Sequence, residues 1–179
     1  MGFVSTSRLI CFFFVSLAMI GAVTPVRAAV DIDGDGFADA VELQYGYDPT
    51  DPRPIKLPKR IEINLKKQEL TYFVGEHVVG RHLVSAGAKG WPTPRGEFKI
   101  LNKSPKAWSK VAGLWMPYWM GFAARGKVGL HELPIWPSGK REGADHLGHP
   151  ASHGCVRLGI GPAKALYDWA DIGTKIMVQ

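Results

Sequence analysis

The chain has 179 residues and a net charge of +6, enough length for one domain of ordinary size with small additions. The charge is unevenly divided: residues 31–51 contain seven acidic residues and no Lys or Arg, whereas residues 52–179 contain twenty basic and nine acidic residues. A basic body is attracted to anionic walls, membranes or polysaccharides, and without a recognisable binding motif we expect no nucleic-acid partner.

Residues 1–28 have the pattern of a secretory signal peptide. Arg8 precedes an apolar run over residues 9–23, and small or short side chains follow near residue 28. A membrane anchor is the alternative, but the run is shorter than the ~20 residues that a spanning helix needs. We therefore predict cleavage after Ala28 or Ala29, export to the periplasm or cell wall, and no stable membrane insertion afterwards.

Residues 29–52 match a calcium-binding loop followed by a short helix. The matching residues occupy positions 1, 3, 5, 6, 9 and 12 of the twelve-residue loop and are Asp31, Asp33, Asp35, Gly36, Asp39 and Glu42. Carboxylates at alternate positions can place oxygens around an ion, and Glu42 can close the site with both of its oxygens. The alternative is a solvated acidic tail.

The same segment departs from an EF-hand, because signal cleavage leaves no room for the entering helix. Together with its continuation ELQYGYDPTDP, it resembles the short calcium repeats of thrombospondin type 3 kind in exported bacterial proteins. The resemblance implies carboxylate ligands and one backbone carbonyl, from Asp31, Asp33, Asp35, Asp39, Glu42 and Phe37. We expect a structural Ca²⁺ rather than a signalling one, since extracellular calcium is plentiful and such sites can be weak.

A basic linker over residues 53–59 leads into a long β-rich region, residues 60–179. Ile61, Ile63 and Leu65 alternate with polar residues and predict a strand at residues 60–65. Turns at residues 66–68 and 75–76 lead into strands at 69–74 and 77–85, and further strands are predicted at 96–101, 119–123, 128–131 and 175–178. One short helix is predicted from Pro162, with an apolar stripe and with Gly173 just beyond its end. We therefore predict a mainly β domain, a sandwich or barrel with one short helix.

Cys155 is the only cysteine left once Cys11 is removed with the signal peptide. An unpaired thiol in an exported protein indicates a reactive group or an intermolecular bridge, although a buried and inert cysteine is the alternative. Four histidines lie within twenty-five residues of it: His131, His146, His149 and His153. The last three could bind zinc with Cys155, but Gly148 and Pro150 exclude an aligning helix, and no CxxC or HExxH pattern is present.

The second interpretation of the cysteine is a Cys–His pair for acyl transfer. A nucleophile on a loop is usually served by a base from a separate element, and His131 ends the predicted strand at residues 128–131. His153, two residues before the cysteine, is less well placed to hold its ring on the sulfur. Gly154 permits a tight bend, so the amides of Gly154 and Cys155 could bind a developing oxyanion.

Five motifs occur along about residues 58–179: RIEINLKKQELTYFVGEHVVGRHLVSAG, TPRGEFKI, MPYWMGF, GLHELP and SHGCVRL. In this order they resemble the L,D-transpeptidase catalytic domain family of YkuD type. Two features depart from the family: the interval between His131 and Ser152 is longer than usual, and Arg157 stands where many members have Asn. The first indicates a longer loop near the site, the second bears on substrate preference, and neither removes a catalytic group.

The resemblance implies that Cys155 is the nucleophile and His131 its base, with a backbone carbonyl at Glu132 orienting the imidazole. The residues implied to shape the oxyanion hole and hold the donor stem are Ser152, His153, Gly154 and Arg157. Tyr118 and Trp119 are candidate pocket walls, with a place in the core as the alternative for either aromatic ring. No cofactor is expected for catalysis, and the implied partner is peptidoglycan. The oligomeric state is not predicted.

The implied reaction is a two-step acyl transfer on peptidoglycan. Cys155 attacks the carbonyl of the third stem residue, releases the terminal D-alanine and forms a thioester, which an amine of another stem resolves to a 3→3 cross-link. Water or a lipoprotein lysine as acceptor gives the alternatives, an L,D-carboxypeptidase or a lipoprotein-anchoring transferase. A non-catalytic, calcium-dependent wall-binding module is the alternative from another class. A papain-type protease is disfavoured, because the histidine precedes the cysteine.

Overall fold

The structure, a computed structural model, describes residues 30–179. The predicted signal peptide, residues 1–28, lies outside the described residues. Within residues 30–179, no helix combines the length and hydropathy that crossing a bilayer requires.

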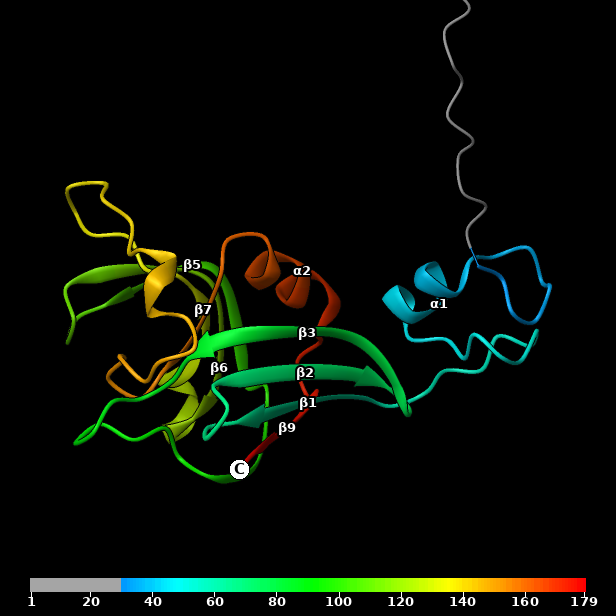
Figure 1. The fold of residues 1–179 in the computed structure, drawn as a ribbon, viewed down its shortest axis with the longest axis horizontal. Coiled ribbons are helices and arrows are strands. Elements are labelled where there is room, and N and C mark those ends of the chain that lie inside the picture. The colour runs from blue at the N-terminus through cyan, green and yellow to red at the C-terminus, as the bar shows by residue number, and fades with distance from the viewer. Residues whose placement is uncertain (1–29) are drawn as a thin grey trace, which may run out of the picture.

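Nine strands form one strongly curled sheet, the main body of the molecule in Figure 1. They are β1 (Lys59–Asn64), β2 (Glu69–Val74), β3 (His77–Ser85), β4 (Gly96–Lys99), β5 (Asn102–Ser109), β6 (Leu114–Ala123), β7 (Val128–Glu132), β8 (Val156–Leu158) and β9 (Lys175–Val178). Their order across the sheet is β4-β9-β1-β2-β3-β8-β7-β6-β5. Neighbours are antiparallel except for the pairs β1–β9 and β7–β8, which are parallel. The fold is thus mainly β, as the sequence predicts.

The first three predicted strands match the structure to within about one residue. β1 shows the expected alternation of buried and more exposed residues, and short turns separate β2 and β3 from their neighbours. β5 and β8 are the strands that the sequence analysis missed. β5 lies at the sheet edge and carries polar residues and Pro105, which edge strands tolerate. β8 has three residues, all buried, so it shows no alternation to recognise.

The core fills the inside of the curled sheet and is closed by the helix α2 (Pro162–Trp169). Pro162 stands in the first turn, where its missing N–H costs no hydrogen bond. Ala163, Leu166 and Trp169 turn one face of the helix inward and are almost fully buried. Burying a leucine side chain such as that of Leu166 contributes roughly 1.5–3 kcal/mol. α2 packs on β6 and on β7, the strand that contains His131, and so supports the position of that strand.

The N-terminal segment contains the helix α1 (Asp39–Tyr45), which lies near β3. Leu43 packs against the main core, and its carbonyl oxygen accepts a hydrogen bond of 3.2 Å from Trp169 Nε1 of α2. α1 lies at one end of the molecule in Figure 1, whereas residues 133–146 lie at the other. The 3₁₀ turns η1 (Ala124–Gly126) and η2 (Ala144–His146) complete the described elements.

Candidate active site

The parallel pairing of β7 with β8 brings the predicted nucleophile and base together. Leu130 pairs with Val156 and His131 with Arg157, so Cys155, one residue before β8, lies beside the end of β7 that holds Gly129. The Gly129 backbone forms a hydrogen bond with the Cys155 thiol. A side chain at Gly129 would place its Cβ 2.5 Å from the Met120 carbonyl oxygen, so only glycine fits there.

His131 is held in a single orientation by its neighbours. Its Nδ1 lies 2.6 Å from the backbone oxygen of Glu132, and the residue is only 2% exposed. Because a carbonyl can only accept, Nδ1 carries the proton and Nε2 keeps its lone pair. The Trp119 ring stacks on the imidazole with centroids 6.1 Å apart. This tautomer leaves Nε2 able to accept a proton, which a general base requires.

Burial sets the protonation state of both groups. It lowers the pKa of His131 to about 4, with the Arg157 charge also lowering it and the Glu132 hydrogen bond acting in the opposite direction. Burial also raises the pKa of the Cys155 thiol, against the Gly129 hydrogen bond and the Arg157 charge, which lower it. At neutral pH the site therefore holds a neutral imidazole and a protonated thiol rather than an ion pair.

Cys155 and His131 line one cavity of about 200 Å³. The other lining residues come from the loop after β3, the β5–β6 hairpin, the start of β7 and the 152–157 motif, and are Trp91, Ser109, Val111, Ala112, Leu114, Met116, Lys127, Val128, Ser152, His153 and Arg157. The hairpin residues and Lys127 were not predicted from sequence, because they carry no recognisable motif and reach the cysteine only when the sheet curls. Of the two cationic side chains that line the cavity, Lys127 is exposed and Arg157 is buried.

The turn before Cys155 is held by hydroxyl groups. Gly154 has φ 105°, a conformation that favours glycine, and its N–H donates to Ser152 Oγ at 3.0 Å. Ser152 Oγ in turn donates to the Cys155 carbonyl, and Thr93 Oγ donates to the Gly154 carbonyl at 2.9 Å. Because the Gly154 amide is engaged by Ser152, the Cys155 amide is the better candidate for the predicted oxyanion hole.

Tyr118 and Trp119, predicted as pocket walls, do not line the cavity. Trp119 is buried, donates from Nε1 to Asn102 Oδ1 at 2.8 Å and stacks on the His131 ring. Tyr118 turns towards α2, where its ring lies 5.7 Å from that of Tyr167. Tyr118 packs against the main core, whereas Trp119 belongs to the small apolar cluster with Leu114 and Met116 against which Cys155 packs.

Arg157 lines the cavity, and its charge is paired inside the protein. Its Nη1 donates to Glu142 Oε1 at 2.9 Å and to the Ala151 carbonyl at 3.3 Å. The two charged side chains are 8% and 5% exposed. An anionic substrate would have to compete with the Glu142 carboxylate for this guanidinium.

The histidines considered for zinc do not converge on Cys155. The His153 ring lies against Trp91 at 5.2 Å, while His146 Nδ1 lies 3.0 Å from Glu142 Oε1. In the part of the chain that the structure describes, the only group of potential metal ligands that comes together is Asp31, Asp33 and Asp35. The zinc interpretation is therefore not supported.

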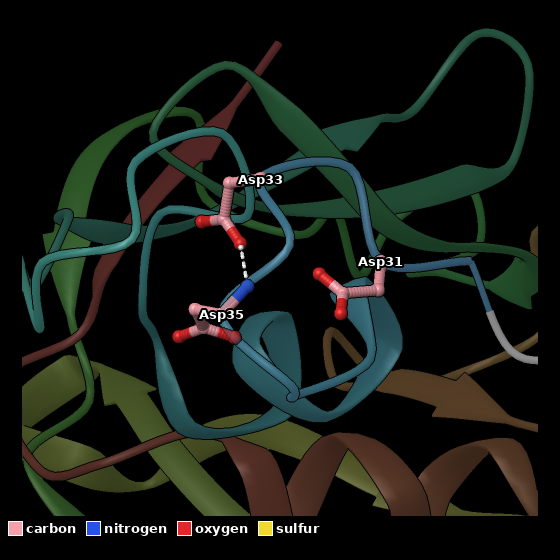
Figure 2. Close-up of side chains that lie close together, drawn as sticks. All are labelled: Asp31, Asp33 and Asp35. Carbon is pink, nitrogen blue, oxygen red and sulfur yellow. Dashed lines mark hydrogen bonds between the residues drawn. The ribbon is translucent and has the colours of Figure 1, made fainter.

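The carboxylates of Asp31, Asp33 and Asp35 gather inside the N-terminal loop, and Figure 2 shows them on one turn of backbone. One ligand oxygen from each lies within 4.8 Å of the others. These aspartates also accept hydrogen bonds from backbone amides nearby in the sequence. Asp31 accepts from the amides of Gly34 and Gly36, and Asp33 Oδ1 accepts from the Asp35 amide at 3.2 Å. Gly36 has φ 96°, the turn that position 6 of the calcium loop requires.

The other three predicted calcium ligands take different positions. Asp39 Oδ1 accepts from the Ile32 amide at 2.8 Å, and Phe37, predicted to offer its backbone carbonyl, donates from its amide to Asp35 Oδ1 at 2.8 Å. Glu42 is 7% exposed, and its Oε2, like Asp33 Oδ2, is buried without a hydrogen-bond partner among residues 30–179. Burial and the charges of Asp33 and Asp35 raise the Glu42 pKa, so its carboxyl lies near the acidic loop. Buried carboxylate oxygens without a donor are what a cation site needs.

Comparisons with known proteins follow the same part of the chain. Residues 58–178 match the family model described as YkuD, L,D-transpeptidase catalytic domain. YciB of Bacillus subtilis, whose L,D-transpeptidase name is itself provisional, is 29% identical over 126 residues, 66% of this chain and 64% of that protein.

Two solved structures show the same fold. An L,D-transpeptidase from Stackebrandtia nassauensis has a TM-score of 0.58 at 29% identity, with 70% of this chain and 57% of that chain covered. An L,D-transpeptidase from Mycobacterium smegmatis has a TM-score of 0.58 at 25% identity, with coverages of 69% and 59%. This chain thus spans less than two thirds of the length of YciB and of these two chains.

Proposed function

The chain belongs to the L,D-transpeptidase catalytic domain family, and on that premise we propose that it is an exported cysteine acyltransferase acting on peptidoglycan stem peptides. The observation that carries the proposal is the shared cavity of Cys155 and His131. The imidazole is held there by the Glu132 carbonyl with Nε2 unprotonated. A thiol, a positioned base and a hollow beside them are the parts that acyl transfer requires.

The first step is acylation of Cys155. The sulfur attacks the carbonyl carbon of the third stem residue while His131 Nε2 takes the thiol proton, and an oxyanion develops on the substrate. The amide of Cys155 is the candidate donor to that oxyanion. When the tetrahedral species collapses, the bond to the terminal D-alanine breaks, and the imidazolium returns the proton to the leaving amine. A thioester remains on Cys155.

The second step transfers the acyl group to an amine of another stem. His131 takes a proton from the attacking amine, the C–S bond breaks, and the sulfur is reprotonated. The product is a 3→3 cross-link.

In the first step, the Cys155 thiol and the His131 imidazole are both neutral before the attack. The proton therefore moves from sulfur to imidazole as the C–S bond forms, and the buried site avoids carrying a separated thiolate–imidazolium pair.

Lys127 is proposed to hold an anionic group of the donor stem. It lines the cavity, and its ammonium has no hydrogen bond or ion pair with any residue between 30 and 179. Arg157, the other cation of the cavity, is already paired with Glu142. A flexible lysine at the cavity edge can meet a carboxylate without disturbing the buried pair.

Product analysis tests the reaction. Purified protein is incubated with tetrapeptide stems, and mass spectrometry distinguishes cross-linked dimers, which support transfer, from tripeptide alone, which shows hydrolysis by an L,D-carboxypeptidase. A lysine-bearing lipoprotein peptide in the same assay tests the third acceptor. A Cys155→Ala variant with full activity would contradict all three reactions, namely cross-linking, hydrolysis and lipoprotein anchoring, because each proceeds through a thioester on Cys155.

The rival function is a calcium-dependent wall-binding module with an inert cysteine. It predicts slow alkylation of Cys155 that does not depend on His131, and retention of the protein on purified peptidoglycan. Faster alkylation of the wild type than of a His131→Asn variant near neutral pH supports the enzyme.

We further propose that residues 31–42 bind a structural Ca²⁺. The residues present fit the ion: three clustered aspartates, a buried Glu42 without a donor, and glycine at the tight turn. The bound ion would offset the repulsion among these carboxylates. Calorimetric titration with Ca²⁺ tests this proposal, and a Glu42→Gln variant that binds as tightly as the wild type would contradict it.

A further inference from the structure

Two ion pairs fasten the long loop between β7 and β8 to both strands of the active site. Arg141 Nη1 binds the Glu132 carboxylate and also donates to the Leu133 carbonyl at 3.1 Å. Glu142 accepts from Arg157 at 2.9 Å. Since Arg141 and Glu142 are consecutive, one point of the loop is tied to β7 next to His131 and to β8 two residues beyond Cys155.

These contacts lie inside the protein. The side chains of Glu132, Glu142 and Arg157 are 5%, 5% and 8% exposed, and only Arg141 reaches solvent, at 31%. Interior ion pairs are little screened by salt, and losing one partner leaves the other charged and unpaired. The loop position is also held by the backbone, because the Glu142 amide donates to the Pro134 carbonyl at 3.0 Å.

Glu132 has two roles that connect the loop to the base. Its backbone oxygen accepts from His131 Nδ1, and its carboxylate binds Arg141. A shift of the Arg141 side chain therefore acts on the residue whose carbonyl orients the imidazole.

Glu142 is connected to the nucleophile through charge. Arg157 lowers the pKa of the Cys155 thiol, and the Glu142 carboxylate lies directly on that guanidinium. A negative charge there offsets the positive field that reaches the sulfur. The charged and titratable groups around the pair are His131 and Glu132 on β7, Arg141 and His146 on the loop, and Lys127 and His153 at the cavity.

We propose that Arg141 and Glu142 are positioning residues for the Cys155–His131 pair: Arg141 orients the base through Glu132, and Glu142 sets the charge at the nucleophile through Arg157. This rests on the proposed function. It assigns a task to the long loop, whose ion pairs the acyl-transfer chemistry by itself does not require.

The first test measures the pH dependence of Cys155 alkylation by iodoacetamide. Glu142→Gln leaves Arg157 uncompensated, so the midpoint moves to lower pH by about one unit. Arg157→Gln leaves Glu142 uncompensated, so the midpoint moves to higher pH. The double variant removes both charges and returns the midpoint to within about 0.3 unit of the wild type. Midpoints that do not move in opposite directions overturn the role of Glu142.

Two controls distinguish a charge effect on the alkylation midpoint from an effect of unfolding. Asp168→Asn breaks the exposed pair with Lys164 on α2 and leaves the midpoint unchanged. If a single variant at 142 or 157 does not fold, the double variant decides, since removing both partners of a buried pair is tolerated better than removing one. A double-variant midpoint well above that of the wild type then shows that Arg157 acts without compensation, which contradicts the proposal.

The second test concerns Arg141. Arg141→Gln is expected to reduce the acylation rate with a tetrapeptide stem by about tenfold, with KM and the alkylation midpoint unchanged. Arg141→Lys recovers part of the rate, because its charge still meets Glu132. An Arg141→Gln variant that melts like the wild type and acylates at the wild-type rate overturns this role. Failure of the acyl-transfer function is seen separately, as an active Cys155→Ala variant.

Discussion

The buried, neutral His131 should make the stability of the protein fall in acid. The pKa of His131 is about 4 in the folded protein, whereas an unfolded histidine titrates near 6.5. The folded pKa is the lower one, so the unfolded chain binds the proton first. Stability is therefore complete above about pH 6.5 and is lost as the pH falls towards 4.

The magnitude follows from the difference between the two pKa values. A difference of about 2.5 units at roughly 1.4 kcal/mol per unit means that His131 removes roughly 3 kcal/mol of unfolding free energy between pH 7 and pH 4. No discount for solvent is needed, because the residue is 2% exposed. This is a large part of the stability of an ordinary domain.

Urea denaturation from pH 7 to pH 4 measures this loss. Other groups titrate in the same range, so the informative quantity is the difference between the wild type and His131→Asn, whose amide does not titrate. That difference should shrink by roughly 3 kcal/mol over the range. Parallel stability curves for the two proteins would refute the reasoning, since they would mean that the imidazole is protonated equally in the folded and unfolded chains.

Three further predictions follow from the same geometry. Gly129→Ala should destabilise the fold and slow acylation, because its Cβ would lie 2.5 Å from the Met120 oxygen; thermal melting and turnover check this, and full activity would contradict it. Lys127→Gln should raise KM for an anionic tetrapeptide stem several-fold with little change in kcat, whereas an unchanged KM would remove Lys127 from substrate binding. Chelating calcium should expose the segment before residue 53 to protease without abolishing acylation; a complete loss of activity that calcium restores would show that the segment is coupled to the active site.

Local sequence patterns predict the strands and helices whose formation depends on neighbouring residues in the chain. The alternation along residues 60–65 and the turns that follow it predict three strands, and Pro162 predicts the start of α2, because side-chain period, turn residues and helix-start chemistry are local properties. The polar edge strand β5 and the buried, three-residue β8 have no such pattern. Both are strands only because another strand offers hydrogen bonds to them.

In the candidate site too, some features can be predicted from the sequence and others depend on the tertiary structure. The sequence predicts Cys155 as the nucleophile and His131 as its base, because residue types and motif order indicate which chemistry is available, and the structure brings both side chains to one cavity. Tertiary structure decided how those groups are tuned: burial keeps both neutral, and Glu142 takes the charge of Arg157. Protonation and ion pairing depend on desolvation and on distances between residues far apart in the chain, and both are set only when the chain has folded.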